Sequence, residues 1–246
     1  MNLVQKLPVG LAIACLLTLS SCSEETMQTA DPLNERNSSS LREGQEGGGI
    51  VVLPSFPTTN GPTGSNVYAT HWERNILTNP DNPQILPTGS SSFTHLWGNS
   101  NSPWSKPLPA IAGATSPASI ATVTTNSNTW SPNGKRSGVK TKLKYLKPGK
   151  KYTITFRVAT TQYNGYLLPF VATYAKAVHL VRSYSTGAVA DYVDLTGKQA
   201  VWVDKTITFT AEESEMTLSF SAINANEGEY SYAHIFVDKN AIQEVN

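Results

Sequence analysis

The sequence predicts an all-β fold, specifically a β-sandwich. Two observations carry this prediction. Short segments of alternating apolar and polar residues, each bounded by turn residues, recur through the second half of the 246-residue chain. Segments with helical spacing are few by comparison. A chain of this length can bury a sizeable core by packing alone, without disulfides.

The first residues predict a targeting segment. Lys6 precedes an apolar run over residues 7–19, which contains Pro8 and Gly10. A membrane-spanning helix needs about 20 apolar residues, so this interrupted run is too short to span. We therefore expect it to be a cleaved signal.

The end of this run, Leu19-Ser20-Ser21-Cys22, resembles the lipobox of bacterial lipoproteins. The resemblance implies that residues 1–21 are a lipoprotein signal peptide and that lipid on Cys22 attaches the chain to a membrane. The alternative is an ordinary secretory signal followed by a stray cysteine. Because Cys15 lies inside the signal, the mature chain keeps one cysteine and has no disulfide framework.

Residues 22–49 have the composition of a flexible, acidic, Ser/Gly-rich tether. Residues 23–49 contain six acidic and two basic residues, a net charge of −4. With so little apolar area the segment should be disordered, spanning about 28 Å. Ser23-Glu24-Glu25 is similar to the acidic tag that sends some Gram-negative lipoproteins to the cell surface. We therefore expect a lipid-anchored protein of the outer membrane that faces the cell exterior.

The lead-in to the domain and its first third are rich in turn residues. Residues 50–71 predict an irregular lead-in with a possible edge strand over 50–53, because Pro and Gly interrupt the pattern repeatedly. Order begins at 72–76. Within the polar segment 86–133 we expect one strand, over 118–124, and otherwise long surface loops.

The clearest strand signal lies in residues 135–158, where two alternating segments meet at Pro148-Gly149. The inward faces comprise Val139, Thr141, Leu143 and Tyr145 before this corner and Tyr152, Ile154, Phe156 and Val158 after it. The corner is either a two-residue hairpin or an arch between two sheets, since the side-chain alternation fits both. Pro at the first corner position presets a type I or II turn, whose twist splays a tight hairpin, so we favour the arch.

The remaining chain predicts further strands. Residues 170–181 fit helical spacing almost as well as a buried strand, and we assign a strand from 172 to 183. The other expected strands cover 190–195, 201–210, 216–223 and 232–237, with turns at 196–197 and 226–228. The predicted sandwich domain thus spans residues 72–246.

Three motifs together resemble carbohydrate-binding modules with a galactose-binding-like jelly-roll fold. They are Asn-Ile-Leu-Thr-Asn-Pro-Asp at 75–81, Leu-Lys-Pro-Gly-Lys-Lys-Tyr-Thr-Ile-Thr-Phe at 146–156 and Trp-Val-Asp-Lys-Thr-Ile-Thr-Phe-Thr-Ala at 202–211. The sequence departs from the family pattern at Pro80, where these modules have Gly, and at Asn82-Pro83, where they have Phe-Glu. Since the motifs consist of core and corner residues, the resemblance implies a jelly roll more than it implies sugar binding.

No catalytic or metal-binding pattern is evident in the sequence. The four histidines lack a second ligand at metal-site spacing, and Asp191 and Asp194 point to opposite faces of a strand. The calcium site common in the resembled modules would draw here on Asp81 and Asp238, and two acids are few for a hard cation. We therefore expect no enzymatic activity, no cofactor and no metal.

Aromatic residues in polar, loop-like contexts are the best candidates for ligand binding. They are Trp97, Trp104, Trp130, Tyr163 and Tyr166. Sugar rings present apolar faces that stack on flat aromatic rings. The alternative is that these side chains fold back and cap the ends of the sandwich.

A second candidate is the basic stripe of Lys140, Lys142 and Lys144, which share the outer face of one strand about 6.6 Å apart. Such a stripe suits an acidic polysaccharide or lipopolysaccharide phosphates, and equally suits protection of an exposed strand from aggregation. The chain's net charge of +1 argues against nucleic acid as a partner.

The sequence as a whole favours a non-catalytic cell-surface lipoprotein that binds glycan or another extracellular ligand through its loop aromatics. The alternative hypothesis is a structural or assembly subunit that contacts a protein partner at the outer membrane.

Overall fold

The computed structural model describes residues 52–77, 86–114, 118–130, 135–165 and 171–245. All of them belong to the second of two compact units, residues 39–246. The predicted signal peptide, Cys22, the tether, Asp81 and Tyr166 lie outside the described residues. Within the described ranges, no helix is long and apolar enough to cross a membrane.

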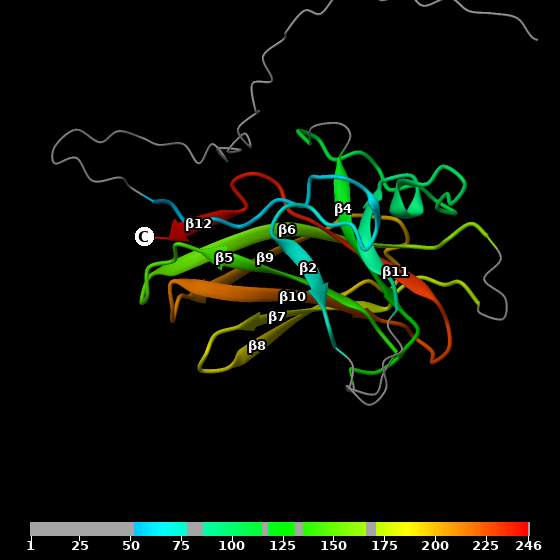
Figure 1. Cartoon of the computed structure of the whole chain (residues 1–246). Coiled ribbons are helices and arrows are strands. Elements are labelled where there is room, and N and C mark those ends of the chain that lie inside the picture. The colour runs from blue at the N-terminus through cyan, green and yellow to red at the C-terminus, as the bar shows by residue number, and fades with distance from the viewer. Residues whose placement is uncertain (1–51, 78–85, 115–117, 131–134, 166–170, 246) are drawn as a thin grey trace, which may run out of the picture. The chain divides into compact units, whose positions relative to one another are not determined.

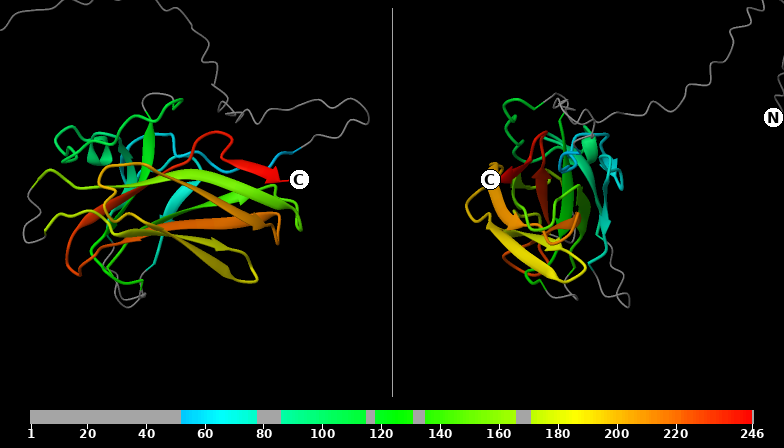
Figure 2. Two further views of the ribbon diagram at one scale, coloured as in Figure 1. Left: turned by 180° about the vertical axis from the view of Figure 1, so that it is seen from behind. Right: turned by 90° about the vertical axis from the view of Figure 1, so that its left-hand side faces the viewer.

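Two antiparallel sheets pack face to face, which confirms the predicted all-β jelly-roll sandwich (Figures 1 and 2). The seven-stranded sheet runs in the order β1 (Gly64–Ser65), β3 (Thr88–Ser92), β4 (Ser119–Thr125), β11 (Ser231–Phe236), β6 (Lys151–Thr161) and β12 (Ile242–Val245), with β9 (Val203–Thr210) along the other side of β6. The five-stranded sheet runs in the order β2 (Trp72–Asn75), β5 (Gly138–Lys144), β10 (Glu215–Ile223), β7 (Ala177–Ser183) and β8 (Ala188–Asp194). A short 3₁₀ turn, η1 (Leu96–Gly98), follows β3.

The corner at Pro148-Gly149 is an arch, as predicted, because β5 and β6 belong to different sheets. Lys150 N donates to Lys147 O at 3.0 Å, and Gly149 has a φ of 81°, so residues 147–150 form a type II turn. Gly149 N also donates to Ala211 O at 2.7 Å. The arch is therefore tied to the connection between β9 and β10.

The core lies between the sheets and is built from alternate residues of each strand. Of the predicted inward set, Val139, Thr141, Leu143, Tyr152, Ile154, Phe156 and Val158 are buried. The prediction for Tyr145 is wrong, because its φ of 62° breaks the alternation and leaves its side chain exposed. Leu146 takes the buried position instead.

Several predicted boundaries shift in the structure. Residues 52 and 53 are not in a strand, although Ser55 forms a bridge to Lys144. Strand β7 begins at Ala177 rather than at 172, and strands β1, β3 and β12 were not predicted. The predicted strands over 118–124, 190–195, 201–210, 216–223 and 232–237 match β4, β8, β9, β10 and β11 within two residues at each end.

The outer faces of the two sheets differ in their covering. On the seven-stranded sheet, a buried apolar cluster joins the loop after β3 to the strands beneath it. Its members are Leu108, Ile111, Ile120, Ala159, Ala200 and Phe236. On the five-stranded sheet, the outward residues of β7 and β8 are half-buried or exposed. The outer face of the five-stranded sheet is therefore accessible to solvent along β7 and β8.

Candidate functional site

The structure divides the predicted ligand-binding aromatics between two places. Trp97, Trp104 and Tyr163 form one group with Leu96 and Tyr232, which we call the loop cluster. Trp130 instead packs against His179 and Tyr192 on the five-stranded sheet. Together with Arg136 these three residues form the sheet-face cluster.

Trp104 is the buried base of the loop cluster. Its side chain is 2% exposed, and its Nε1 donates to Ser92 O at 3.1 Å. Its ring packs against the rings of Tyr232 and His234, at centroid distances of 5.4 and 5.1 Å. An indole so enclosed is not available at the surface, so Trp104 supports its neighbours and does not present its own ring.

Trp97 and Tyr163 are the half-buried members of the loop cluster. Trp97 has a φ of 55° and is followed by Gly98, where a Cβ would lie 2.1 Å from Thr63 Oγ1. A left-handed backbone at a bulky residue is uncommon and is held here by the surrounding loop. Binding of a ligand by Trp97 and Tyr163 stays a prediction.

The sheet-face cluster is built on a cross-strand pair. His179 of β7 lies opposite Tyr192 of β8, and their rings stack at 4.5 Å with an interplanar angle of 5°. Val178 and Leu180, on either side of His179 in the chain, point into the core. Because side chains alternate along a strand, the His179–Tyr192 pair lies on the outer face of the sheet. The Trp130 ring packs on both, at 4.6 Å from His179 and 5.6 Å from Tyr192. Because Tyr192 is 53% exposed, part of this aromatic surface faces solvent.

Arg136 adds a fixed positive charge to the sheet-face cluster. Its guanidinium carbon lies 5.2 Å from the centroid of the Trp130 ring, within the range of a cation–π contact. Nη1 donates to Ser221 Oγ at 2.9 Å and Nη2 to Trp130 O at 2.8 Å. Within the described part of the chain, Arg136 Nε and His179 Nε2 are buried atoms without a hydrogen-bond partner. Unsatisfied buried polar atoms are rare in folded proteins, and two of them meet in this cluster.

Burial and the guanidinium together set the charge state of the cluster. Burial lowers the pKa of His179, and the positive charge of Arg136 lowers it further, while Asp191 acts in the opposite direction. Burial also lowers the pKa of Arg136, though a guanidinium stays charged at any physiological pH. At neutral pH the cluster thus combines a neutral imidazole, two other aromatic rings and one cation.

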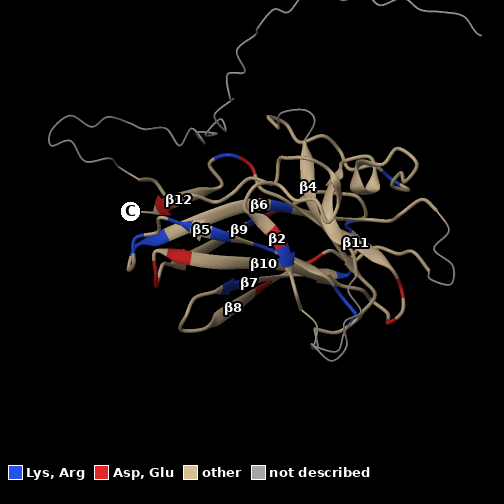
Figure 3. Ribbon diagram, viewed as in Figure 1, with Lys and Arg blue, Asp and Glu red and all other residues tan. Residues whose placement is uncertain are grey.

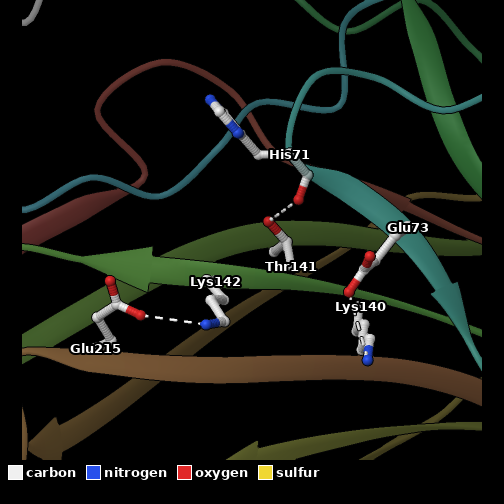
Figure 4. Close-up of polar contacts among 6 residues, drawn as sticks. All are labelled: His71, Glu73, Lys140, Thr141, Lys142 and Glu215. Carbon is white, nitrogen blue, oxygen red and sulfur yellow. Dashed lines mark hydrogen bonds and ion pairs between the residues drawn. The ribbon is translucent and has the colours of Figure 1, made fainter.

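The lysines of the basic stripe lie on the same outer face as the sheet-face cluster, along β5. Two of them are paired with carboxylates: Lys140 Nζ lies 3.4 Å from Glu73 Oε1 and Lys142 Nζ lies 3.3 Å from Glu215 Oε2 (Figure 4). Figure 3 shows these acidic positions on β2 and at the start of β10, beside the basic positions of β5. These ion pairs reduce the net charge of the basic stripe. A role of the stripe in ligand binding stays a prediction.

The described residues contain no group of three or more His, Cys, Asp or Glu side chains that is arranged to hold a metal ion. Of the two acids considered on sequence as a catalytic pair, Asp191 accepts a hydrogen bond from Arg182 Nε at 3.0 Å, and Asp194 accepts one from Thr196 N at 2.9 Å. These contacts fix a β-strand edge and a turn. They assign neither residue a chemical role.

The chain was compared with known proteins by sequence and by structure. No protein-family model matches it, and no curated protein matches its sequence. Among solved structures it is similar to a CBM4 carbohydrate-binding module, with a TM-score of 0.35 and 15% identity over 58% of this chain and 91% of that one.

Two further carbohydrate-binding modules show a likeness of the same order. One is TmCBM61 in complex with β-1,4-galactotriose, with a TM-score of 0.33 and 12% identity over 54% of this chain and 74% of that one. The other is a family 16 module, with a TM-score of 0.31 and 13% identity over 59% of this chain and 85% of that one. Likeness at this level concerns the fold and does not extend to a ligand.

Sequence reasoning missed three members of the sheet-face cluster, namely Arg136, His179 and Tyr192. One signal for Tyr192 was present, because Val193 and Leu195 define the apolar face of the predicted strand and Tyr192 falls on the polar face. A large aromatic on the polar face of a strand is a candidate for binding. No comparable signal marks Arg136, whose place beside Trp130 depends on the path of the chain before β5.

Proposed function

We propose that this protein is a non-catalytic, lipid-anchored protein of the outer cell surface that binds glycans on the sheet-face cluster. The observation that carries the proposal is the packing of Trp130, His179 and Tyr192 into a partly exposed aromatic surface beside Arg136. Stacking on such a surface provides apolar contact to a sugar ring, and nearby polar atoms provide hydrogen bonds to its hydroxyls.

The five-stranded sheet supports this choice of surface. Its aromatic rings are held by strand pairing and by each other, so they lose little conformational entropy when a ligand binds. The signal, the lipobox-like Cys22 and the acidic tether are the grounds on which the cell-surface location is proposed.

Retention of the purified mature domain on a panel of polysaccharides tests the proposal. We expect Trp130→Ala and Tyr192→Ala each to weaken binding at least tenfold, because each removes a stacking surface. Tyr145→Ala is the matched control, since Tyr145 is an exposed tyrosine on the arch, outside the cluster. Absence of binding by the unmodified domain to every glycan in the panel would contradict the proposal.

A second candidate function is assembly with an outer-membrane protein, which one observation favours. Strand β8 is an edge of the five-stranded sheet, and its Val189 and Tyr192 are 51% and 53% exposed. An edge strand with exposed apolar side chains can receive a strand from a partner. Stoichiometric co-purification of a membrane protein, lost on Val189→Lys and kept on Tyr145→Ala, is the result expected of this function.

A further inference from the structure

A pocket borders the sheet-face cluster and shares Arg136 with it. It is small, with room for about one water-sized group, and is lined by Arg74, Asn75, Ile76, Leu77, Leu86, Arg136 and Ser137. Two of these residues are cations, and none of the described lining residues is acidic. Gly138, the first residue of β5, packs close to the pocket: a Cβ there would lie 2.7 Å from Leu77 Cδ1 and would displace that side chain.

Both arginines at the pocket are held by neutral oxygens. Arg74 Nη1 donates to Leu86 O at 2.9 Å and Nη2 to Asn66 Oδ1 at 2.6 Å. Arg136 donates to a serine hydroxyl and to a main-chain carbonyl. These contacts fix the two guanidinium groups in place without neutralising their charge.

The other two arginines of the described chain behave differently. Arg157 lies 2.8 Å from Asp204 Oδ1, and Arg182 lies 3.0 Å from Asp191 Oδ2. Of the four arginines, only the two at the pocket form no ion pair with a described residue.

The contrast is strongest at Arg136, which is 8% exposed. A buried cation without a counterion is costly, because it loses its hydration and gains no attraction in return. Its Nε is also a buried donor without a partner among the described residues. A group that supplied both negative charge and acceptor oxygens would therefore compensate both deficits.

We propose that the glycan bound by this protein is acidic and that an oxygen of its carboxylate enters the pocket between Arg74 and Arg136. A planar carboxylate matches the planar fork of a guanidinium better than it matches a lysine ammonium, and Lys140 and Lys142 of β5 are already paired with Glu73 and Glu215. Since Arg136 touches both pocket and Trp130, one ligand can place a sugar ring on the aromatic surface and its acid group in the pocket. This inference rests on the proposed glycan binding.

Matched acidic and esterified sugars test the inference. Oligosaccharides of galacturonate, of glucuronoxylan and of alginate are compared with their methyl esters by titration calorimetry at low salt. We expect at least one acidic form to bind and its ester to bind at least tenfold more weakly. The affinity of the acidic form should fall as salt is raised, because the contact is electrostatic.

Variants locate the effect. Arg136→Gln and Arg74→Gln should each bring the affinity for the acidic oligosaccharide close to that for its methyl ester. Because Arg136 is buried, its variant can fail to fold, and the Arg74→Gln variant then provides the test. Arg157→Gln on β6 is the control for overall charge and should change nothing. Equal binding of acid and ester, or binding only to neutral glycans, overturns the inference and leaves the proposed function standing. Failure to bind any glycan overturns both.

Discussion

His234 is a fully buried histidine beneath the loop cluster, and its environment tolerates only the neutral form. Thr122 Oγ1 lies 3.0 Å from its Nδ1 and Thr161 Oγ1 lies 2.6 Å from its Nε2, so both ring nitrogens have hydroxyl partners. The Trp104 ring packs against it. Burial lowers the pKa of His234 from 6.5 to about 3. Its role is therefore structural, as a polar link between β4, β6 and β11.

This lowered pKa predicts a loss of stability in acid. As pH falls below 6.5, the unfolded chain takes up a proton at this site and the folded chain does not, until pH approaches 3. The stability contributed by neutral His234 is thus present above pH 6.5 and is lost between pH 6.5 and 3, up to about 5 kcal/mol. In urea denaturation, we expect His234→Gln to destabilise the domain more at pH 7 than at pH 4. His71→Gln, at an exposed position, is the control, and an equal loss at both pH values would contradict the prediction.

The tryptophans show how far single residues could be interpreted from the sequence. Trp97, Trp104 and Trp130 occupy similar polar contexts, yet one is half-buried on a left-handed turn, one is buried, and one packs on a sheet in another part of the domain. Local composition predicts a loop, but the burial of a loop side chain depends on contacts with distant strands. Those contacts carry no periodic signal in the sequence.

At the scale of elements, the arch between β5 and β6 joins the two sheets and was predictable except at Tyr145, whose positive φ no alternation pattern indicates. Alternation set the inward residues, and the geometry of Pro at the first corner position favoured an arch over a hairpin. Strand β3 was not predictable in the same way, because its sequence Thr-Gly-Ser-Ser-Ser has no apolar residue to alternate. Pairing with β4 and β1 defines it, and both of those contacts are distant in sequence.

The arch yields a prediction about Gly149. Its φ of 81° is favourable only for glycine, and a Cβ there would meet no atom within 4 Å, so the cost of a side chain is purely conformational. We expect Gly149→Ala to lower the free energy of unfolding by about 1 to 2 kcal/mol and Gly149→Asn by less. Gly187→Ala, which has open space and no positive φ, is the control. Urea denaturation measures the free energy of unfolding of all three variants. An unchanged free energy in Gly149→Ala would show that a side chain does not strain the turn.

At the scale of the whole domain, the two outer faces carry different side chains. The loop after β3 covers part of the seven-stranded sheet with buried apolar residues, while the outer face of the five-stranded sheet carries the aromatic cluster and the lysines of β5. The sequence predicted the sandwich and two of these components, Trp130 and the lysines. It did not predict that they share one face, because that depends on the strand order β5, β10, β7, β8.

The proposed location predicts how the full chain behaves in cells. If Cys22 carries lipid, the protein should fractionate with membranes, and Cys22→Ser should release it to the soluble fraction, because the lipid would be the anchor. Cys15→Ser is the control, since that residue would be removed with the signal.

Protease added to intact cells should digest the domain if Ser23-Glu24-Glu25 directs it outward. Replacing Glu24 and Glu25 with Ala should then protect it while leaving it in the membrane fraction. Membrane attachment without Cys22 would refute the lipid anchor, and protection of the unmodified protein would refute the outward orientation alone.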